Sequence, residues 1–294
     1  MNIWLLVSML LCVSQQLLAA KVPDPVAVGA LPTGRNNSYC EPQLCARGKQ
    51  HVACDKSLNE AQRTCSVEQA QLLNLTNYAD VIVKTHNELR QRLASGKNMT
   101  LPRAARMVAM QWSEELATLA SYNSRMCQAK HDACRNTANF KRSGQNIIVS
   151  NCSWRRTLTL LIAQVFNLTR LVENELMDKL YPELLQLGVR SWWAEHSNGS
   201  NIMNEADVEH YSCTYKRPQH LFRHFAVMAV ENNTHVGCAG VRYLTKQLTH
   251  FKLTCNYAED FVCGKQIYHT RSSACQTGPN PHHKALCSKK ETFA

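Results

Sequence analysis

Fourteen cysteines in 294 residues restrict this chain more than any other feature of its sequence. One of them, Cys12, lies in an apolar leader, and the other thirteen lie between Cys40 and Cys287. A reducing cytosol would keep so many thiols free, so this density indicates an oxidising compartment and a fold held by disulfides. The spacing does not favour zinc binding, because no Cys-x-x-Cys pair is present. Since thirteen is odd, at least one thiol is free, capped or bonded to another chain.

Residues 1–20 have the composition of a secretory signal peptide. They contain no charged side chain, carry an apolar run from Ile3 to Val13, and end in Ala19-Ala20, which are small enough for signal peptidase. The run is shorter than the roughly 20 apolar residues that cross a bilayer. We therefore expect cleavage near Ala20, and a secreted, extracellular protein with no transmembrane anchor.

Asn-x-Ser/Thr sequons support the same route, because N-linked glycans are added only in the secretory pathway and must lie on the surface. The acceptor positions are Asn36, Asn74, Asn98, Asn151, Asn167, Asn198 and Asn232. Asn151 is adjacent to Cys152, whose oxidation and burial would compete with glycosylation. We expect a glycoprotein that uses some of these sites.

The formal charge of +11 favours acidic extracellular partners. Lysine and arginine are scattered, without the interleaved aromatic residues of RNA-binding proteins, so we do not expect a nucleic-acid ligand.

The chain is expected to comprise a signal peptide (1–20), a cysteine-rich extension (21–76), a core domain (77–260) and a short cysteine-containing tail (261–294). The extension has four cysteines and little apolar periodicity. It cannot bury a core of its own, so it must be stapled to the larger domain.

The apolar pattern of the core predicts helices first and strands later. Expected helices run from near Asn77 to Ser95-Gly96, from a cap at Ser113, from about 157 to 180, and from Pro182 to Trp193. Expected strands cover 225–230, 236–243 and 249–257, with Asn232-Asn233 as a turn. This order predicts an α+β fold.

Several short motifs follow one another in the core. They are His86-Asn87-Glu88-Leu89-Arg90, His131-Asp132-Ala133-Cys134-Arg135-Asn136, Ser143-Gly144-Gln145-Asn146-Ile147, Trp192-Trp193-Ala194-Glu195, Arg223-His224-Phe225 and Cys255-Asn256-Tyr257-Ala258. In this order they resemble the CAP superfamily of cysteine-rich secretory proteins, insect antigen 5 and plant pathogenesis-related proteins. The segment from Tyr39 to Cys54 is similar to the extension of the antigen 5 branch. The resemblance covers roughly Tyr39 to Ser288 and implies an α-β-α sandwich.

The resemblance also implies disulfides, namely Cys40–Cys54, Cys45–Cys134, Cys65–Cys127 and Cys238–Cys255. In the tail we expect Cys275 to pair with Cys287. Two of the remaining three cysteines, Cys152, Cys213 and Cys263, could bond to each other, and which two stays open.

By the same resemblance, a central cleft is lined by His131, His224 and Glu195, with Gln145 at the position of a second acid. An amide cannot act as a general base or supply charge to a cation. Two neutral imidazoles and one carboxylate could still hold Zn²⁺ weakly, with His131 and His224 as ligands. The interpretation we favour is a hydrogen-bonded polar cluster without a cofactor. Arg223 is expected to place a cation beside it.

Two further motifs are interpreted as structural. Trp192-Trp193 is expected to pack in the core, and His86 to make internal hydrogen bonds at the start of its helix.

These observations predict a non-enzymatic, antigen 5-like protein of an extracellular fluid such as venom, saliva or seminal fluid. Its expected partner is a small apolar ligand or lipid, or an extracellular protein. The alternative is a metal-dependent hydrolase or protease that uses His131, His224 and Glu195. A serine hydrolase is not expected, because no Gly-x-Ser-x-Gly motif is present.

Overall fold

The structure, a computed structural model, describes residues 37–56, 70–97, 99–152, 170–198, 201–214, 222–245, 248–271 and 274–293. All of them belong to one unit, Leu31–Ala294. The predicted signal peptide, Cys65, and the sequons Asn36, Asn98 and Asn167 lie outside the described residues.

The centre of the fold is a sheet with the strand order β1-β6-β7-β3, in which β2 also pairs with β6. The strands are β1 (Gln71–Leu73), β2 (Gln111–Trp112), β3 (Gly144–Cys152), β6 (His235–Thr245) and β7 (Leu248–Tyr257). All pairs are antiparallel except the parallel pair of β2 with β6. A separate short hairpin joins β4 (Ser197–Asn198) to β5 (Asn201–Ile202). In this arrangement β3 is an edge strand.

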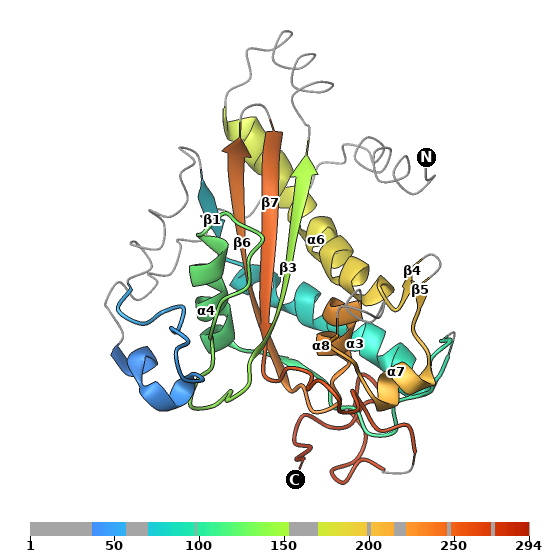
Figure 1. Ribbon diagram of the computed structural model, residues 1–294. Helices are drawn as coiled ribbons and strands as arrows, with labels where there is room; N and C mark the ends of the chain where they lie inside the picture. Colours follow the sequence, from blue (N-terminus) through green and yellow to red (C-terminus); the bar gives the residue numbers. More distant parts are fainter. Residues whose placement is uncertain are drawn as a thin grey trace. The chain divides into compact units, whose positions relative to one another are not determined.

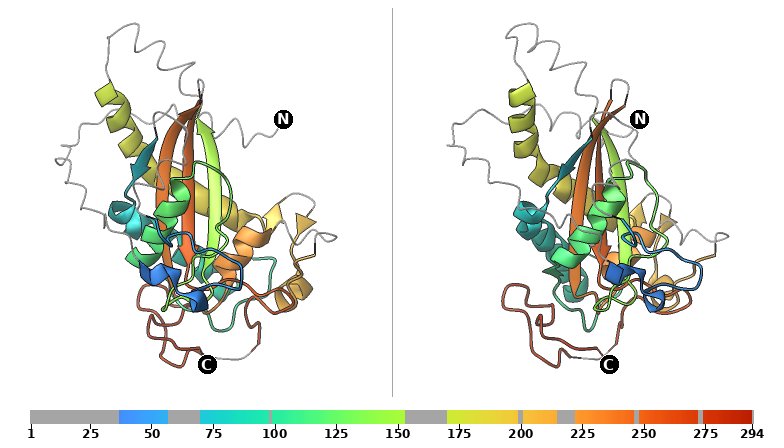
Figure 2. Two further views of the ribbon diagram at one scale, coloured as in Figure 1. Left: turned by 60° about the vertical axis from the view of Figure 1, so that its left-hand side comes forward. Right: turned by 90° about the vertical axis from the view of Figure 1, so that its left-hand side faces the viewer.

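Helices cover both faces of the sheet, which confirms the predicted α-β-α sandwich (Figures 1 and 2). On one face lies α4 (Glu114–Ser124), and on the other lie α3 (Ala79–Ser95), α6 (Arg170–Ala194) and α8 (Arg223–Ala229). The remaining helical segments are α7 (Glu205–Glu209) and the 3-10 turns η1 (Asn37–Cys40), η2 (Pro42–Leu44) and η3 (Thr76–Tyr78).

Strand β7 shows how the sequence separates the two layers. Successive side chains of a strand point to opposite faces, and from Lys252 to Asn256 the even-numbered ones are polar and bind α4. Lys252 Nζ donates to Asn123 O at 2.7 Å, and Asn256 Nδ2 donates to Leu116 O at 3.3 Å. The odd-numbered side chains face the apolar core with α3 and α6 instead: Phe251, Leu253 and Tyr257.

Helix α4 approaches the sheet closely because of a glycine. A Cβ atom on Gly237 of β6 would lie 2.3 Å from Ser113 O, so only glycine permits this separation. The helix begins as predicted, with the Ser113 side chain accepting a hydrogen bond from Leu116 N. Helix α3 also ends as predicted, because Gly96 adopts a left-handed φ of 69° after Ser95.

The expected strand over 225–230 is wrong, because Phe225 to Ala229 belong to helix α8 and Val230 is its C-cap. Phe225 to Val230 is a continuous apolar run, and all of it is buried. Periodicity cannot distinguish a short buried helix from a buried strand when every residue is apolar. The turn at Asn232 therefore joins a helix, not a strand, to β6.

The expected helix start at Pro182 is also wrong. Pro182 lies inside α6, which runs without a break from Arg170 to Ala194. Proline keeps a helical φ and loses one backbone hydrogen bond. Packing of Tyr181, Leu185 and Val189 in the core supports the continuous helix at this point. Of the helix expected over 157–180, residues 157–169 lie outside the described part.

The cysteine-rich extension is attached to the α4 side of the fold. Cys40 is bonded to Cys54 and Cys45 to Cys134, as the resemblance implied. A small apolar cluster joins the extension to α4: Tyr39, Val52, Ala53, Leu119 and Tyr122. The predicted Cys65–Cys127 bond involves a residue outside the described ranges, so that pair stays a prediction.

The tail packs against the body of the domain. Cys275 is bonded to Cys287, as predicted. Cys213 is bonded to Cys263, which is the pairing that the sequence left open. Cys238 is bonded to Cys255 between β6 and β7. Tail residues Ile267, Tyr268 and Leu286 are part of the main core. Among the helices in the described ranges, none has the length and apolar character needed to span a membrane.

Two predicted glycan acceptors, Asn74 and Asn198, are exposed, whereas Asn232 is half-buried. We expect Asn74→Gln and Asn198→Gln each to remove one glycan from protein made in a eukaryotic secretory host. The measurement is intact mass before and after peptide N-glycosidase. Thr76→Ser, which preserves the Asn74 sequon, is the control and should keep the glycan. An unchanged mass after the enzyme would show that these positions are not used.

Candidate functional site

The four side chains predicted to line the cleft form two hydrogen-bonded pairs, and together they are called the polar site here. In the first pair, His131 Nδ1 lies 3.0 Å from Gln145 Oε1. In the second, His224 Nδ1 lies 2.6 Å from Glu195 Oε1. The residues come from the loop before β3, from β3, from the C-terminal end of α6 and from the first turn of α8.

The orientation of the Gln145 amide is determined by its neighbours. Gln145 Nε2 donates to Asp132 Oδ2 at 2.6 Å and to Asn256 Oδ1 at 3.0 Å. A carboxylate can only accept, so Nε2 must face Asp132 and Oε1 must face His131. His131 therefore donates from Nδ1, and in the neutral ring its Nε2 carries the lone pair.

Asp132 is itself held in place. Its carboxylate accepts from Asn123 Nδ2 at 2.7 Å, and Arg135 Nε lies 3.5 Å from it. The Asp132 side chain is only 1% exposed. This buried anion orients Gln145, and through Gln145 it orients His131.

The second pair is fixed through the backbone. Glu195 accepts from both His224 Nδ1 and His224 N, at 2.6 and 3.1 Å. Asn146 Nδ2 donates to His224 O at 3.0 Å. The Trp192 ring stacks on the His224 ring with centroids 6.1 Å apart. Both oxygens of the Glu195 carboxylate are thus used to position His224.

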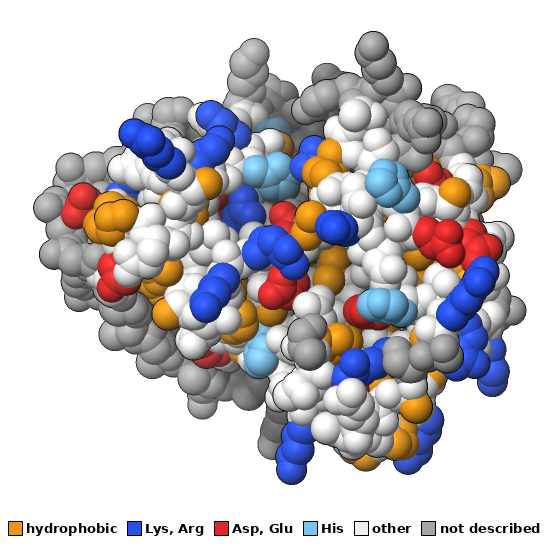
Figure 3. All heavy atoms as spheres, turned by 60° about the horizontal axis from the view of Figure 1, so that its bottom comes forward, with side chains coloured by type: hydrophobic (Ala, Val, Ile, Leu, Met, Phe, Trp, Pro, Cys, Tyr) orange, Lys and Arg blue, Asp and Glu red, His pale blue; other side chains and the backbone are white. Residues whose placement is uncertain are grey.

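The two pairs lie on either side of the edge strand β3. Gln145 and Asn146 are adjacent and point to opposite faces, one binding the His131 side and the other the His224 side. The polar site therefore straddles the edge of the sheet. Figure 3 shows the end of the molecule that lies lowest in Figure 1, where histidine side chains lie among basic and acidic ones.

Burial and nearby cations both favour the neutral form of His131. Burial is the main cause of its lowered pKa, the hydrogen bond that His131 donates to Gln145 opposes the shift, and Arg135, His224 and Arg223 lower the pKa further. Arg223 lies over the Phe261 ring, with Cζ 5.6 Å from the centroid. It thus supplies the cation that the sequence predicted beside the site.

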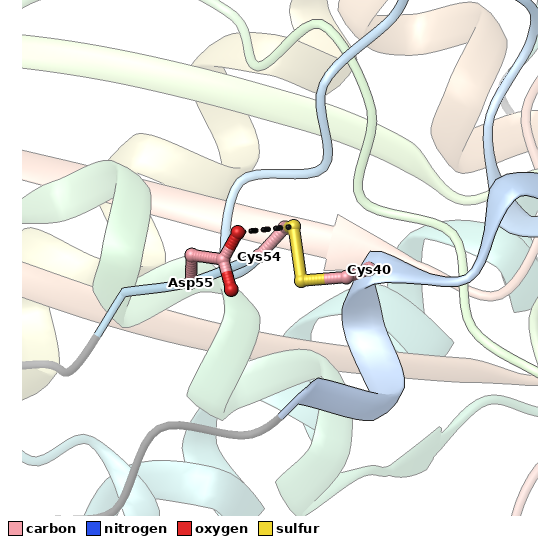
Figure 4. Close-up of side chains that lie close together, drawn as sticks. All are labelled: Cys40, Cys54 and Asp55. Carbon is pink, nitrogen blue, oxygen red and sulfur yellow. Dashed lines mark hydrogen bonds between the residues drawn. A yellow bond between two sulfur atoms is a disulfide. The ribbon is translucent and has the colours of Figure 1, made fainter.

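The side chains of the polar site do not bring three metal-ligating atoms together in this arrangement. In the described part of the chain, the ligand atoms of His131, Glu195 and His224 do not all lie within 4.8 Å of one another. The one group there that meets this condition is Cys40, Cys54 and Asp55 (Figure 4). Its two sulfurs are bonded to each other, so they cannot act as thiolate ligands.

A comparison with known protein families decides the identity of the fold. The model of the family described as "CAP: Cysteine-rich secretory protein family" matches residues 83–257. The chain belongs to the CAP family. The matched residues include the whole sheet except β1 and all four residues of the polar site.

Insect allergens are among the similar CAP proteins. The chain is 33% identical to Venom allergen-1 of Aedes aegypti over 257 residues, which cover 86% of this chain and 88% of that protein. It is 30% identical to the antigen 5 like allergen Cul n 1 of Culicoides nubeculosus, over 71% of this chain and 84% of that protein. These relatives confirm the predicted antigen 5-like branch.

The search of solved structures found other CAP proteins. The structure of NaASP2 with Zn²⁺ is 18% identical to this chain, covers 72% of it and 96% of its own length, and has a TM-score of 0.49.

The orienting residues of this CAP domain were missed at the sequence level. Asp132, Asn146 and Asn256 stand inside the recognised motifs, but nothing in their spacing shows that they orient the polar site. Trp192 packs in the core as expected and also forms a wall beside His224. His86 is buried and makes internal hydrogen bonds, but it lies in the middle of α3, not at its start.

A groove lies between α3 and the end of α6. Its volume is about 700 Å³. Apolar side chains form part of its lining (Leu89, Met99 and Trp193), and three cations stand with them (Arg92, Lys97 and Arg190).

Proposed function

We propose that this CAP protein is a secreted, non-enzymatic protein of an extracellular fluid that carries a small apolar ligand with an anionic group. The groove between α3 and α6 is the observation that carries the proposal. The signal-like leader, the disulfides and the venom-allergen relatives support secretion. Family membership supports a binding role over catalysis.

The size and lining of the groove suit such a ligand. Ligand pockets usually measure about 300–1,000 Å³ and combine an apolar wall with a few polar groups. Here Trp193, which is 4% exposed, and Leu89 offer an apolar wall held rigidly by the core. Met99 is half-buried and flexible, so it can adapt to an alkyl chain.

Charge at the groove favours an anion. Arg92 and Lys97 are exposed beside the apolar wall. Arg190 is partly neutralised, because its Nη2 lies 3.3 Å from Glu88 Oε2. A long-chain carboxylate would place its chain along Met99 and Trp193 and its headgroup near Arg92 and Lys97.

Calorimetric titration with palmitate tests this proposal. We expect Met99→Glu to weaken palmitate binding at least about tenfold, because a buried charge in an apolar groove is unfavourable. We expect Arg92→Gln/Lys97→Gln to weaken palmitate but not hexadecanol, the neutral ligand of the same length.

The matched control is Leu187→Glu. It adds the same charge to α6 at a side chain that is 56% exposed and does not line the groove. Its affinity for palmitate should equal that of the wild type. A wild type that binds neither ligand, or equal losses in Met99→Glu and Leu187→Glu, would contradict the proposal.

The geometry does not favour the metal-dependent hydrolase. Glu195, the one carboxylate of the polar site, accepts two hydrogen bonds from His224. It is positioned to hold the imidazole ring and not to accept a proton from a water molecule.

A further inference from the structure

The tail brings basic residues to the outer surface of α3, on the opposite side of the sheet from α4. Ala285 N donates to Gln91 Oε1 on α3 at 2.9 Å. Just before it, His283 lies beside α3. Burial mainly causes its lowered pKa, but Glu88 raises that pKa and His282 and Lys84 lower it. The tail therefore runs along the helix at this point.

Basic side chains gather along this part of the surface, with Glu88 among them, and together they are called the basic strip here. It consists of Lys84, Arg92, Lys97, Arg190, His283 and Lys284. From Lys84 to Arg92 the helix rises about 12 Å, and Lys97 extends the strip beyond its end. Of the lysines and arginines in the strip, only Arg190 forms an ion pair with another described residue.

An elongated polyanion fits this surface better than a membrane does. Basic residues alone are attracted to anionic lipid, but interfacial binding is strengthened by apolar side chains that enter the headgroup region. Among the described residues, the exposed large hydrophobic side chains are Leu187 and Ile202, and neither belongs to the strip. On the face in Figure 3, hydrophobic side chains likewise form only small, scattered patches.

The side chains of the strip also favour one class of polyanion over another. Single-stranded nucleic acid is bound by aromatic side chains on which bases stack, and the strip contains none except the His283 ring. Flexible lysines act as point charges that suit sulfate groups spaced along a chain. We propose that the basic strip binds a sulfated polysaccharide of the extracellular matrix. The proposal goes beyond ligand carriage in the groove, although the strip shares Arg92, Lys97 and Arg190 with the groove lining, and both proposals rest on secretion.

The test is binding of the full-length mature protein to an immobilised heparin oligosaccharide at increasing salt. We expect binding at low ionic strength that weakens as salt screens the charges. We expect Lys84→Gln/Lys284→Gln to weaken heparin binding at least about tenfold. These two lysines do not line the groove, so palmitate affinity should be unchanged. The two ligands therefore test the two proposals separately: heparin tests the strip, and palmitate tests the groove.

The matched control is Arg47→Gln/Lys49→Gln. It removes the same charge from exposed positions of the extension, on the α4 side of the sheet. It should change heparin affinity less than about twofold. Equal losses in the two double variants would overturn the proposal, since net charge alone would then explain binding. Equal affinity for unsulfated hyaluronan would also overturn it. So would tighter binding of phosphatidylserine vesicles or duplex DNA than of heparin, if Lys84→Gln/Lys284→Gln weakened that binding.

Discussion

Replacing Arg90 with methionine should lower the free energy of unfolding by about 3 kcal/mol or more, the largest effect we expect from a single substitution. Arg90 is 0% exposed and donates five hydrogen bonds to backbone carbonyls. The acceptors are Val108, Met228, Val230 and Glu231. They belong to the segment before β2 and to the end of α8 with the turn after it, so one side chain joins three parts of the fold.

Burial lowers the pKa of Arg90 to about 9, so the guanidinium is still charged at neutral pH. Methionine fills similar space but removes all five donors. Val230 O and Glu231 O keep a backbone donor, from Asn233 N and Val108 N, whereas Val108 O and Met228 O lose the arginine that serves them, and an unsatisfied buried polar group costs about 1–3 kcal/mol. Arg90→Lys keeps the charge but provides a single nitrogen, so it should also destabilise the fold, by a smaller amount.

Equilibrium unfolding in urea, with disulfides intact, is the measurement. Arg92→Met is the matched control, because it makes the same chemical change on an exposed position of the same helix. It should change stability by less than about 0.5 kcal/mol. A loss below about 1 kcal/mol in Arg90→Met would show that the carbonyls find other donors and that Arg90 does not join these segments.

Long periodic elements and capped ends were predictable from the sequence. The apolar steps of α3, the Ser113 cap of α4 and the alternation in β6 and β7 each have a local physical cause, and the structure confirms all three. The motif order predicted the family and its sandwich, because it reflects residues that are distant in sequence and meet at the polar site.

Other features depend on tertiary contacts that no local pattern records. The run from Phe225 to Val230 is apolar throughout, and burial on all sides makes it a helix. Lys252 carries a charged side chain, yet it is 0% exposed, and its Nζ donates a hydrogen bond to Asn123 O inside the α4 layer. Strand β3 received no assignment, because its polar residues Gln145 and Asn146 serve the site and break the apolar pattern.

Converting Gln145 to glutamate should make the stability of the protein depend on Zn²⁺. In the wild type, Gln145 Nε2 donates to Asp132 Oδ2 at 2.6 Å. In Gln145→Glu a second carboxylate oxygen takes that place, and two like charges at this distance cannot both stay ionised without cost. We expect the variant without metal to be less stable than wild type by about 1–3 kcal/mol.

A divalent cation would offset that repulsion, and it would gain a carboxylate ligand beside His131 Nδ1, which can coordinate it once the ring carries its proton on Nε2. We therefore expect Zn²⁺ to raise the unfolding midpoint of Gln145→Glu and to leave that of the wild type nearly unchanged, since ligands that bind only the folded state stabilise it. Calorimetric titration should show weak or absent Zn²⁺ binding to the wild type and tighter binding to the variant. Adding His131→Ala to the variant should remove the gain.

The decisive comparison is Asp132→Asn/Gln145→Glu, which exchanges the amide and the carboxylate of the pair. The hydrogen bond is then restored with its polarity reversed, so much of the lost stability should return without metal, and a double-mutant cycle measures this coupling. If the exchange restores nothing, the destabilisation does not arise from the contact between residues 132 and 145. If instead the wild type binds Zn²⁺ with submicromolar affinity that His131→Ala abolishes, the polar site is a metal centre and the hydrolase alternative takes precedence.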